Sequence, residues 1–438
     1  MEIAVHSNAT PIATGNFKPV PLLAIGGLVS FLLIFNGFLF RTYSIAMESA
    51  PWEAARQFGL PYILAEIGVI LYAIRQGLNL RDLWSKLPRA LQYCSVFFLA
   101  TFWVGGAMYS EVALPATLQN LIFLLHPLFA VAVYHLIARI DAAGLRGLVL
   151  ALAIGLIIFC GMTAVAFINH PPLSSMPNNE IIWQFIIPGF ISVRLFGAFC
   201  GAIFCVLLAQ LLLNEETAQK RFLPYVWLTL CGAMTIWSGT RNAVLGIMAA
   251  MAVMLIIYRL RPTGFKSVGL LVLSATIAYW LAVSLIPYDD PAFMLISSQD
   301  SASTESISGG RASYWRALWN AYQSVPIFGA GPFASFWILP VGEQVHVQPH
   351  NIIVQFLLSW GFSAALAALI LLAYATFHAH RVGLKHRNIL PFLAMLDSLL
   401  VMSFFDGTVH FAQPLMLIMI SFGVIFSAHK TEAEPLAG

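Results

Sequence analysis

Apolar runs, separated by short polar segments, occupy most of the chain. A helix needs about 20 mostly apolar residues to cross the hydrocarbon core of a bilayer, so each run predicts one membrane-spanning helix. We expect about twelve such helices. Their approximate limits are 20–40, 59–75, 90–109, 114–137, 147–168, 190–213, 223–237, 241–258, 267–286, 350–376, 389–405 and 411–428. The pattern therefore predicts an all-α fold, a polytopic membrane helix bundle.

Two assignments need further explanation: the division of residues 223–258 into two spans, and the run 20–40 as a membrane anchor. Residues 223–258 are too long for one spanning helix, so the turn SGTR at 238–241 is expected to separate two spans. The run 20–40 follows a polar segment, exceeds the apolar region of a cleavable signal peptide and lacks a small-residue cleavage site after it. We therefore expect it to be the first membrane anchor.

Composition narrows the class of protein. Hydrophobic residues make up 60% of the chain and charged residues 9%, whereas a soluble domain carries about 25% charged residues. So few charges cannot form a water-facing surface, which excludes a soluble enzyme, a nucleic-acid-binding protein and a disordered chain. The five cysteines lie in apolar runs without a CxxC pair, which predicts buried small side chains and neither a disulfide framework nor a metal site.

Lysine and arginine predict the orientation. If the N-terminus is cytoplasmic, 16 of the 22 basic side chains fall in cytoplasmic segments and six in outer segments, as the positive-inside rule requires. We therefore expect an even number of spans and both termini in the cytoplasm. The outer side carries arginine alone, and its members are Arg41, Arg56, Arg194, Arg241, Arg311 and Arg316. A planar guanidinium suits phosphate binding, although chance also favours Arg, which outnumbers Lys 16 to 6.

The predicted spans divide the chain into four parts. Residues 1–189 hold N-terminal transmembrane helices, 190–286 central helices with arginine motifs, 287–349 a long outer loop, and 350–438 the C-terminal helices. A loop this long inside a compact protein is usually functional. The third part is therefore the first place to look for a site.

One segment of the long loop, RASYWRALWNAYQ at 311–323, has a helical pattern. Arg311, Trp315, Leu318 and Tyr322 fall on one face of the helix that it predicts. Tryptophan and tyrosine are enriched at the membrane–water interface. We therefore expect a short interfacial helix along the outer leaflet.

Arg311 lies in the first turn of this helix, where the helix dipole disfavours a cation. An anion held by Arg311, the helix N-terminus and the Gly309–Gly310 backbone would explain its position. The alternative is that Arg311 reaches lipid headgroups. Arg316 points elsewhere and is either a surface residue or an auxiliary substrate contact.

Arg241 and Arg194 lie at the outer ends of predicted spans. A cation at the mouth of an apolar span is costly unless it is paired or faces a water-filled cavity. Ser238 and Thr240 are candidate caps for the helix that Arg241 begins, which again would give an anion site. Arginines gathered at the membrane boundary suggest a polyanionic substrate with a lipid part, such as a lipid diphosphate.

His346 and His350 have the HxxxH spacing of some metal sites. Pro349 argues against a helix there, and no acidic third ligand is close in sequence, so we do not expect a metal site. His350 precedes a predicted span, where a neutral imidazole can accept a proton from an attacking hydroxyl. A histidine bonded to the backbone at the start of a helix explains its position equally well.

Other polar residues lie in or beside the apolar runs. An ionisable side chain inside a membrane is first considered a candidate functional residue, although it is often explained by a structural partner. They are Glu66, His126, Asp397, Asp406 and His410. The last two flank the outer turn FDGTVH and face the same compartment as His350, so they are possible site neighbours. The pair Asp289–Asp290 is weak evidence for a metal.

Several motifs, in their order and sidedness, give the chain a resemblance to a known family. They are RLFGAF (194–199), SGTRNAVLG (238–246), GGRASYWRALW (309–319), PIFGAGP (326–332) and QPHN (348–351). Together with many spans and one long outer loop, they resemble the O-antigen ligase and polymerase superfamily over roughly residues 190–375.

The resemblance implies a glycosyltransferase of the bacterial inner membrane that works at the periplasmic face without metal or cofactor. Its donor is a glycan on undecaprenyl diphosphate, and its acceptor is a lipid A-core sugar in ligases or another lipid-linked glycan in polymerases. Arg241 and Arg311 match the family's diphosphate-binding arginines, His350 its essential histidine and Arg194 its arginine near the middle spans. Arg316 is a further candidate for substrate binding.

An O-antigen ligase is the leading hypothesis, and a polymerase for O-antigen or exopolysaccharide is the alternative within the superfamily. From a different class, a polysaccharide-lipid transporter or flippase would predict inverted repeats around a site at the membrane midplane. The sequence has no clear repeat, and its charged motifs cluster on one face. A structural scaffold gives the outer arginines no role.

Overall fold

The computed structural model describes residues 59–137, 142–169, 193–214, 222–285, 311–325, 327–340 and 348–428. Within these ranges the regular structure is helical and contains no strand, which confirms the all-α fold class. The predicted anchor at 20–40, Asp289–Asp290 and His346 lie outside the described residues.

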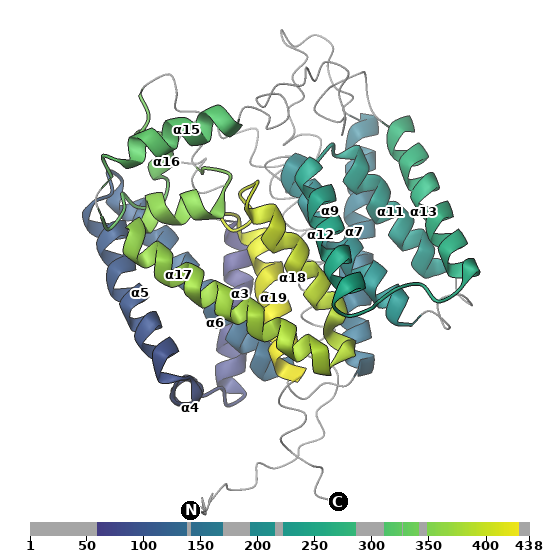
Figure 1. Ribbon diagram of the computed structural model, residues 1–438, viewed down its shortest axis with the longest axis horizontal. Helices are drawn as coiled ribbons and strands as arrows, with labels where there is room; N and C mark the ends of the chain where they lie inside the picture. The colour runs from purple at the N-terminus through teal and green to yellow at the C-terminus, as the bar shows by residue number, and fades with distance from the viewer. Residues whose placement is uncertain are drawn as a thin grey trace, which may run out of the picture.

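The long helices follow the apolar runs and stand side by side in one bundle (Figure 1). They are α3 (Leu60–Arg75), α5 (Arg89–Met108), α6 (Ala113–Ile137), α7 (Ala142–Asn169), α9 (Val193–Leu213), α11 (Leu223–Trp237), α12 (Arg241–Ile256), α13 (Phe265–Ser284), α17 (Ile352–Lys385), α18 (Leu390–Ser403) and α19 (Ala412–Ser427). Shorter helices are α4 (Leu80–Lys86), α15 (Arg311–Tyr322), α16 (Ala334–Trp337) and η3 (Arg387–Ile389). The turn at 238–241 separates α11 from α12, as predicted.

Among the described helices, four are long and apolar enough to cross a membrane: α6, α9, α13 and α17. Helices α3 and α4 meet at an angle of 87°, and they would form a fifth candidate if together they make one broken span. Four shorter apolar helices, Gly147–Met162, Leu223–Trp237, Arg241–Ile256 and Ala412–Ser427, have 10–17 residues each. Several apolar helices therefore support a multi-pass membrane protein, while the count of twelve spans stays a prediction.

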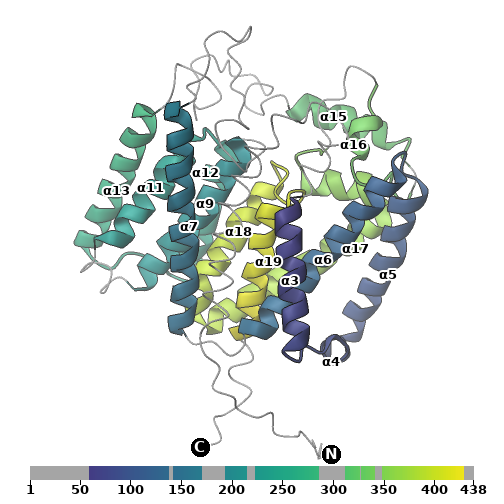
Figure 2. The same ribbon diagram turned by 180° about the vertical axis from the view of Figure 1, so that it is seen from behind.

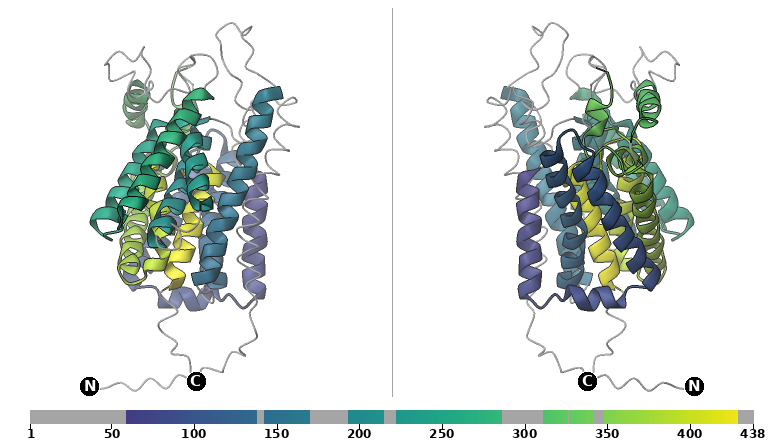
Figure 3. Two further views of the ribbon diagram at one scale, coloured as in Figure 1. Left: turned by 90° about the vertical axis from the view of Figure 1, so that its right-hand side faces the viewer. Right: turned by 90° about the vertical axis from the view of Figure 1, so that its left-hand side faces the viewer.

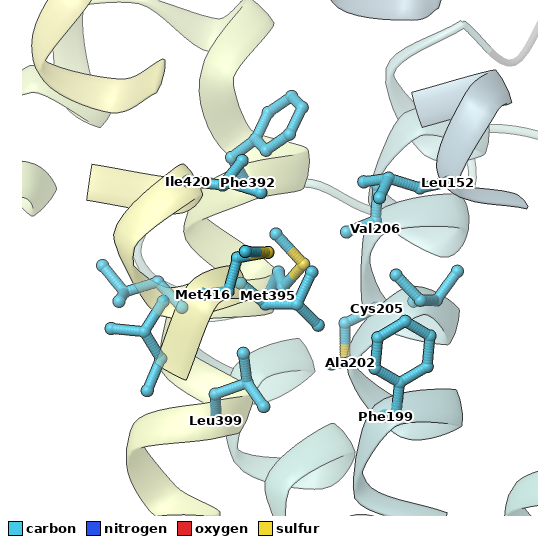
Figure 4. Close-up of a cluster of buried hydrophobic side chains, with 14 of the residues drawn as sticks. Leu152, Phe199, Ala202, Cys205, Val206, Phe392, Met395, Leu399, Met416 and Ile420 are labelled. Carbon is cyan, nitrogen blue, oxygen red and sulfur yellow. The ribbon is translucent and has the colours of Figure 1, made fainter. Parts of the chain in front are cut away.

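The centre of the bundle is formed by α9, α18 and α19, which are the most completely buried helices. Figure 3 shows α18 and α19, in yellow, in the middle of the bundle with other helices around them. Figure 4 shows Phe199, Ala202 and Cys205 of α9 facing Met395 and Leu399 of α18. Cys200, Cys205 and Cys231 are buried, as predicted, whereas Cys94 and Cys160 are only partly buried.

Buried polar residues join neighbouring helices in pairs. His126 Nδ1 on α6 lies 2.8 Å from a carboxylate oxygen of Glu66 on α3, and both side chains are almost fully buried. His380 Nε2 on α17 lies 3.1 Å from Asp397 Oδ1 on α18. A buried charge is costly unless it is paired, so these pairs give Glu66, His126 and Asp397 a structural explanation.

Helix α17 is kinked at Gly361, whose φ of 72° belongs to the left-handed region that favours glycine. The kink interrupts the helical hydrogen bonds to the carbonyls of Leu358 and Ser359. The loop before α16 uses them instead, because Ala330 N donates to Leu358 O at 2.8 Å and Gly331 N to Ser359 O at 3.0 Å. The part of the long loop that carries α16 is thereby fixed against the start of α17.

The helix predicted at 311–323 is present as α15, but its apolar face packs on protein. Leu318 is fully buried against Ala330, Leu339 and Leu358. The loop around α16 and the start of α17 therefore cover this part of the face, while the interfacial position of the helix stays a prediction. Trp319 is 58% exposed on another face.

The two ends of the bundle differ in composition. Figures 1 and 2 show α15, α16, the start of α17 and the α18–α19 turn at one end, and α4 at the other. The α4 end carries Arg75, Arg81, Lys86 and Arg89. This distribution agrees with the predicted separation of the arginine motifs from the lysine-containing turns, whereas the orientation in a membrane stays a prediction.

Single cysteines at exposed positions test this orientation. We expect a membrane-impermeant maleimide to label Ser324→Cys, after α15, in spheroplasts, and to label Ser85→Cys, on α4, only in inverted vesicles, because the basic end belongs in the cytoplasm. The unsubstituted protein supplies the background from its native cysteines. The opposite labelling pattern would reverse the proposed orientation.

Candidate functional site

The centre of the candidate site is Asp406, in the turn between α18 and α19. Its side chain is 3% exposed and accepts hydrogen bonds from Asn242 Nδ2 at 3.0 Å and from its neighbour's backbone, Gly407 N, at 2.8 Å. His350 Nδ1 lies 3.0 Å from Asp406 Oδ1, and Arg311 Nη2 lies 3.5 Å from Asp406 Oδ2. One buried carboxylate therefore connects α12, α15, the start of α17 and the α18–α19 turn.

The electrostatic balance at Asp406 favours the ionised form. Burial by itself would raise the pKa of Asp406, but the hydrogen bond with His350 and the charge of Arg311 outweigh burial and lower the pKa to about 2. The bond from Gly407 N acts in the same direction. At neutral pH the carboxylate is therefore a fixed negative charge beside an imidazole and a guanidinium.

His350 is held in a strained and specific position. Its φ of 56° lies in the left-handed region, which is uncommon for a residue other than glycine and is often found at functional sites. Its backbone N donates to Gln348 Oε1 at 2.8 Å. The next residue, Asn351, caps α17 by accepting from Ile353 N at 2.9 Å and Val354 N at 3.1 Å. Helix α17 therefore begins directly after His350 and fixes its position.

The contact with Asp406 favours one tautomer of the imidazole. A carboxylate accepts hydrogen bonds, so Asp406 favours a proton on His350 Nδ1, the atom 3.0 Å away. In neutral His350 this leaves Nε2 as the acceptor. The amide of Gln348 lies beside both ring nitrogens, with its Nε2 2.9 Å from Nδ1 and 3.2 Å from Nε2. The His350 side chain is 16% exposed, so a substrate can approach it.

Arg311, the first residue of α15, contacts protein through its guanidinium. Besides Asp406, its guanidinium donates to the backbone oxygen of Phe405. The same helix is tied to the histidine turn because Trp315 Nε1 donates to Pro349 O at 2.7 Å. The anion expected between Arg311, the helix N-terminus and Gly309–Gly310 stays a prediction, because these two glycines lie outside the described residues. Since 23% of the Arg311 side chain is exposed, the guanidinium also reaches the outside of the site.

Arg241 begins α12 and is partly exposed, next to Asn242, which bonds Asp406. The expected capping role of Ser238 and Thr240 is wrong. Thr240 occupies the cap position but makes no side-chain capping bond. Instead the Ser238 hydroxyl lies 2.8 Å from that of Thr240 and donates to Thr235 O at 2.7 Å, so the two hydroxyls stabilise the turn itself.

Arg194 lies at the start of α9 and contacts the turn before α12. Its Nη1 donates to Gly239 O at 2.7 Å, which ties α9 to the turn that carries Arg241. Close approach of the two elements depends on Gly197, because a Cβ there would collide with the Ser238 and Thr240 hydroxyls. Arg316 is exposed on α15, as expected for a surface residue or an auxiliary contact.

The structure thus brings Arg311 and His350 together on Asp406 and places Arg241 beside Asn242, a partner of the same carboxylate. Sequence reasoning treated Asp406 only as a possible neighbour and missed Asn242 and Gln348. Two features of the sequence could have indicated these residues. Asp406 is an isolated acid in a short outer turn, and Asn242 is an amide directly after Arg241. Within the described ranges, no group of three or more His, Cys, Asp or Glu side chains forms a metal-binding cluster.

An all-helical protein with several apolar helices and a polar site at one end belongs to the class of multi-pass membrane proteins. Residues 225–369 match the family described as O-antigen ligase. This match supports membership of the O-antigen ligase superfamily, as the motifs predicted. It includes Arg241, Arg311, Arg316 and His350 but not Arg194, whose resemblance rests on its own motif. No curated protein matches the chain significantly.

The charge of Asp406 predicts a dependence of stability on pH. Because the folded-state pKa is about 2 and that of an unfolded Asp is about 3.9, the stabilisation is complete above about pH 5 and is lost as the pH falls through about 2. We expect wild type to lose about 2 kcal/mol more than Asp406→Asn between pH 5 and pH 2, measured by unfolding in detergent.

The matched control is Asp82→Asn, which removes the exposed partner of Lys86 on α4. An exposed ion pair adds little stability, so this variant should keep the pH dependence of wild type. Equal pH dependence in wild type and Asp406→Asn would show that the Asp406 charge is not selectively stabilised by folding.

Proposed function

We propose that the protein is a glycosyltransferase that moves a glycan from undecaprenyl diphosphate to a sugar hydroxyl of lipid A-core, at the periplasmic face of the bacterial inner membrane. The observation that carries the proposal is the group of Arg311, His350 and Asp406 at one end of an apolar bundle, in a chain that matches the O-antigen ligase family. Cationic and proton-accepting groups are close together there, as a lipid-diphosphate donor and a hydroxyl acceptor require.

On the donor side, the reaction needs positive charge. The bond between the anomeric carbon and the diphosphate oxygen breaks, and its electron pair stays on the diphosphate. Arg241 and Arg311 are the side chains that we assign to stabilise this charge, since a guanidinium donates several hydrogen bonds in one plane. Asp406 and Phe405 O orient Arg311 without using all of its donors. Arg194 positions the turn at 238–241, which carries Arg241. Arg316 is assigned as an auxiliary contact at the edge of the donor site.

On the acceptor side, the reaction needs a base. A sugar hydroxyl attacks the anomeric carbon, and its proton passes to His350 Nε2, the ring nitrogen that is not bonded to Asp406. Asp406 then stabilises the imidazolium, as a carboxylate behind a catalytic histidine does in other enzymes. A single displacement of this kind inverts the anomeric configuration. A product that retains the configuration of the donor would contradict the single step.

Two alternatives predict different products. An O-antigen or exopolysaccharide polymerase would use the same donor chemistry and transfer the glycan to a second lipid-linked glycan. A polysaccharide-lipid flippase would move the donor across the bilayer without forming a bond. The polar group at one end of the bundle favours transfer over transport, because a transporter binds its substrate near the membrane midplane.

Reconstitution of the full-length protein with an undecaprenyl-diphosphate-linked glycan separates these functions. A product on lipid A-core supports the ligase, and a lengthened lipid-linked glycan with unmodified lipid A-core supports the polymerase. Translocation in liposomes without a new glycosidic bond would support the flippase and reject both transferases.

Lysine substitutions test the donor site. We expect Arg241→Lys and Arg311→Lys each to lower kcat/KM for the donor by at least about tenfold, because an ammonium point charge does not reproduce the guanidinium fork. The control is Arg261→Lys, an exposed substitution in the turn between α12 and α13 at the opposite end, which should leave transfer unchanged. Transfer at the wild-type rate by Arg241→Lys would remove Arg241 from the mechanism.

Removal of the imidazole tests the base. We expect His350→Ala to reduce kcat by about 10²–10⁴-fold. The affinity for the donor should stay near the wild-type value, and binding of a fluorescently labelled lipid-linked glycan measures it. His386→Ala, beyond the far end of α17, is the control and should retain transfer. If instead donor binding falls and kcat does not, His350 is a ligand for the donor and not the base.

A further inference from the structure

A small pocket lies behind His350, where three elements meet. The loop around α16 contributes Phe333 and Ser335, the start of α17 contributes Gln355 and Ser359, and the α18–α19 turn contributes His410. Pro349, the residue before His350, also lines it. The pocket has a volume of about 10 Å³, which is the space that one water molecule needs.

One residue that lines the pocket, Gln355, has a buried polar atom without a hydrogen-bond partner among the described residues. Gln355 is 4% exposed, and its Nε2 lies 3.2 Å from His410 Nδ1. Its Oε1 has no hydrogen-bond partner among the described residues. An unpaired buried amide oxygen costs free energy, so a donor from outside the protein is favoured at this position.

The chemistry of the lining is neutral. His410 is buried, and burial, followed by the charge of His350, lowers the pKa of His410 to about 3, so its imidazole is uncharged at neutral pH. The other polar groups are an amide and serine hydroxyls, next to the ring of Phe333, which packs edge-on against His410 with centroids 5.8 Å apart. Such a lining gives no compensation for a phosphate charge but suits an uncharged hydroxyl.

We propose that this pocket, with Gln355 Oε1 as acceptor, binds one non-reacting hydroxyl of the acceptor sugar and so selects and orients that sugar in front of His350. The inference rests on the proposed transferase function. It assigns the pocket to the acceptor because Pro349 joins the pocket to the histidine that we assign to the attacking hydroxyl. The arginines of the donor site, by contrast, do not line the pocket.

The size of the pocket limits what it holds. A volume of one water admits a hydroxyl but excludes a whole sugar ring, so the ring lies outside, toward His350. Without the acceptor, a water fits the same position. A site built to bond a hydroxyl discriminates strongly against an analogue that lacks it, because its own buried polar atom is then unpaired. The pocket is therefore a specificity-determining element.

The first arm of the test uses wild-type protein with the acceptor oligosaccharide to which it transfers, and with single-deoxy analogues that keep the reactive hydroxyl. One analogue should show a KM raised about tenfold, which corresponds to about 1.4 kcal/mol, while the KM for the donor is unchanged. If every analogue has the KM of the parent acceptor, the inference is overturned. This arm needs no substituted protein.

The second arm uses Gln355→Leu, which has a similar size and no amide. We expect its acceptor KM to rise about tenfold, with kcat and donor KM within about twofold of wild type. In this variant the sensitive deoxy analogue and the parent acceptor should have equal KM values, because the bond that distinguishes them is gone. Should Gln355→Leu not fold, Gln355→Asn, which keeps the amide but shortens it, is expected to reduce the discrimination.

The control for the second arm is Gln413→Leu. Gln413 is buried at the start of α19, bonds Tyr62 OH at 2.8 Å and does not line the pocket. It should leave the acceptor KM unchanged. Equal effects of Gln355→Leu and Gln413→Leu, or a change in donor KM alone, would overturn the inference. Absence of transfer by wild type to any acceptor would reject the proposed function itself.

Discussion

The carboxylate of Asp406 is the interaction on which the arrangement of the candidate site depends. It is 3% exposed, and a buried charge of this kind is tolerated only where partners surround it. Asn242, Arg311, His350 and the Gly407 backbone N supply these partners from four parts of the chain. Each of these contacts compensates the buried charge, so together they fix the position of the α18–α19 turn.

The helices that present these partners are fixed by ordinary packing. The buried core between α9, α18 and α19 sets where the α18–α19 turn lies, and the kink at Gly361 lets the loop around α16 bond to α17. Leu318 anchors α15 on the same loop. A flexible loop could not hold a base and cations at fixed distances, and preorganisation of this kind is what electrostatic catalysis requires.

The same end of the bundle separates two kinds of chemistry. Asp406 lies beside the charged guanidinium of Arg311, whereas the lining of the pocket next to Pro349 is neutral. A lipid diphosphate and a sugar hydroxyl differ in the same way, since one carries charge and the other does not. The proposed positions of the two substrates follow from this difference, with His350 between them.

The sequence by itself determined the all-α fold, most helix limits, the helix at 311–322 and the gathering of arginine motifs at one end of the bundle. These features depend on local hydrophobicity, periodicity and turn residues, which neighbouring positions encode. Only the tertiary structure decided that Asp406 joins Arg311 to His350, that Gln355 faces His410 and that Leu318 packs on protein. Those contacts connect positions such as 242 and 406, which are far apart in the chain, and they follow from how whole helices pack, which no local pattern specifies.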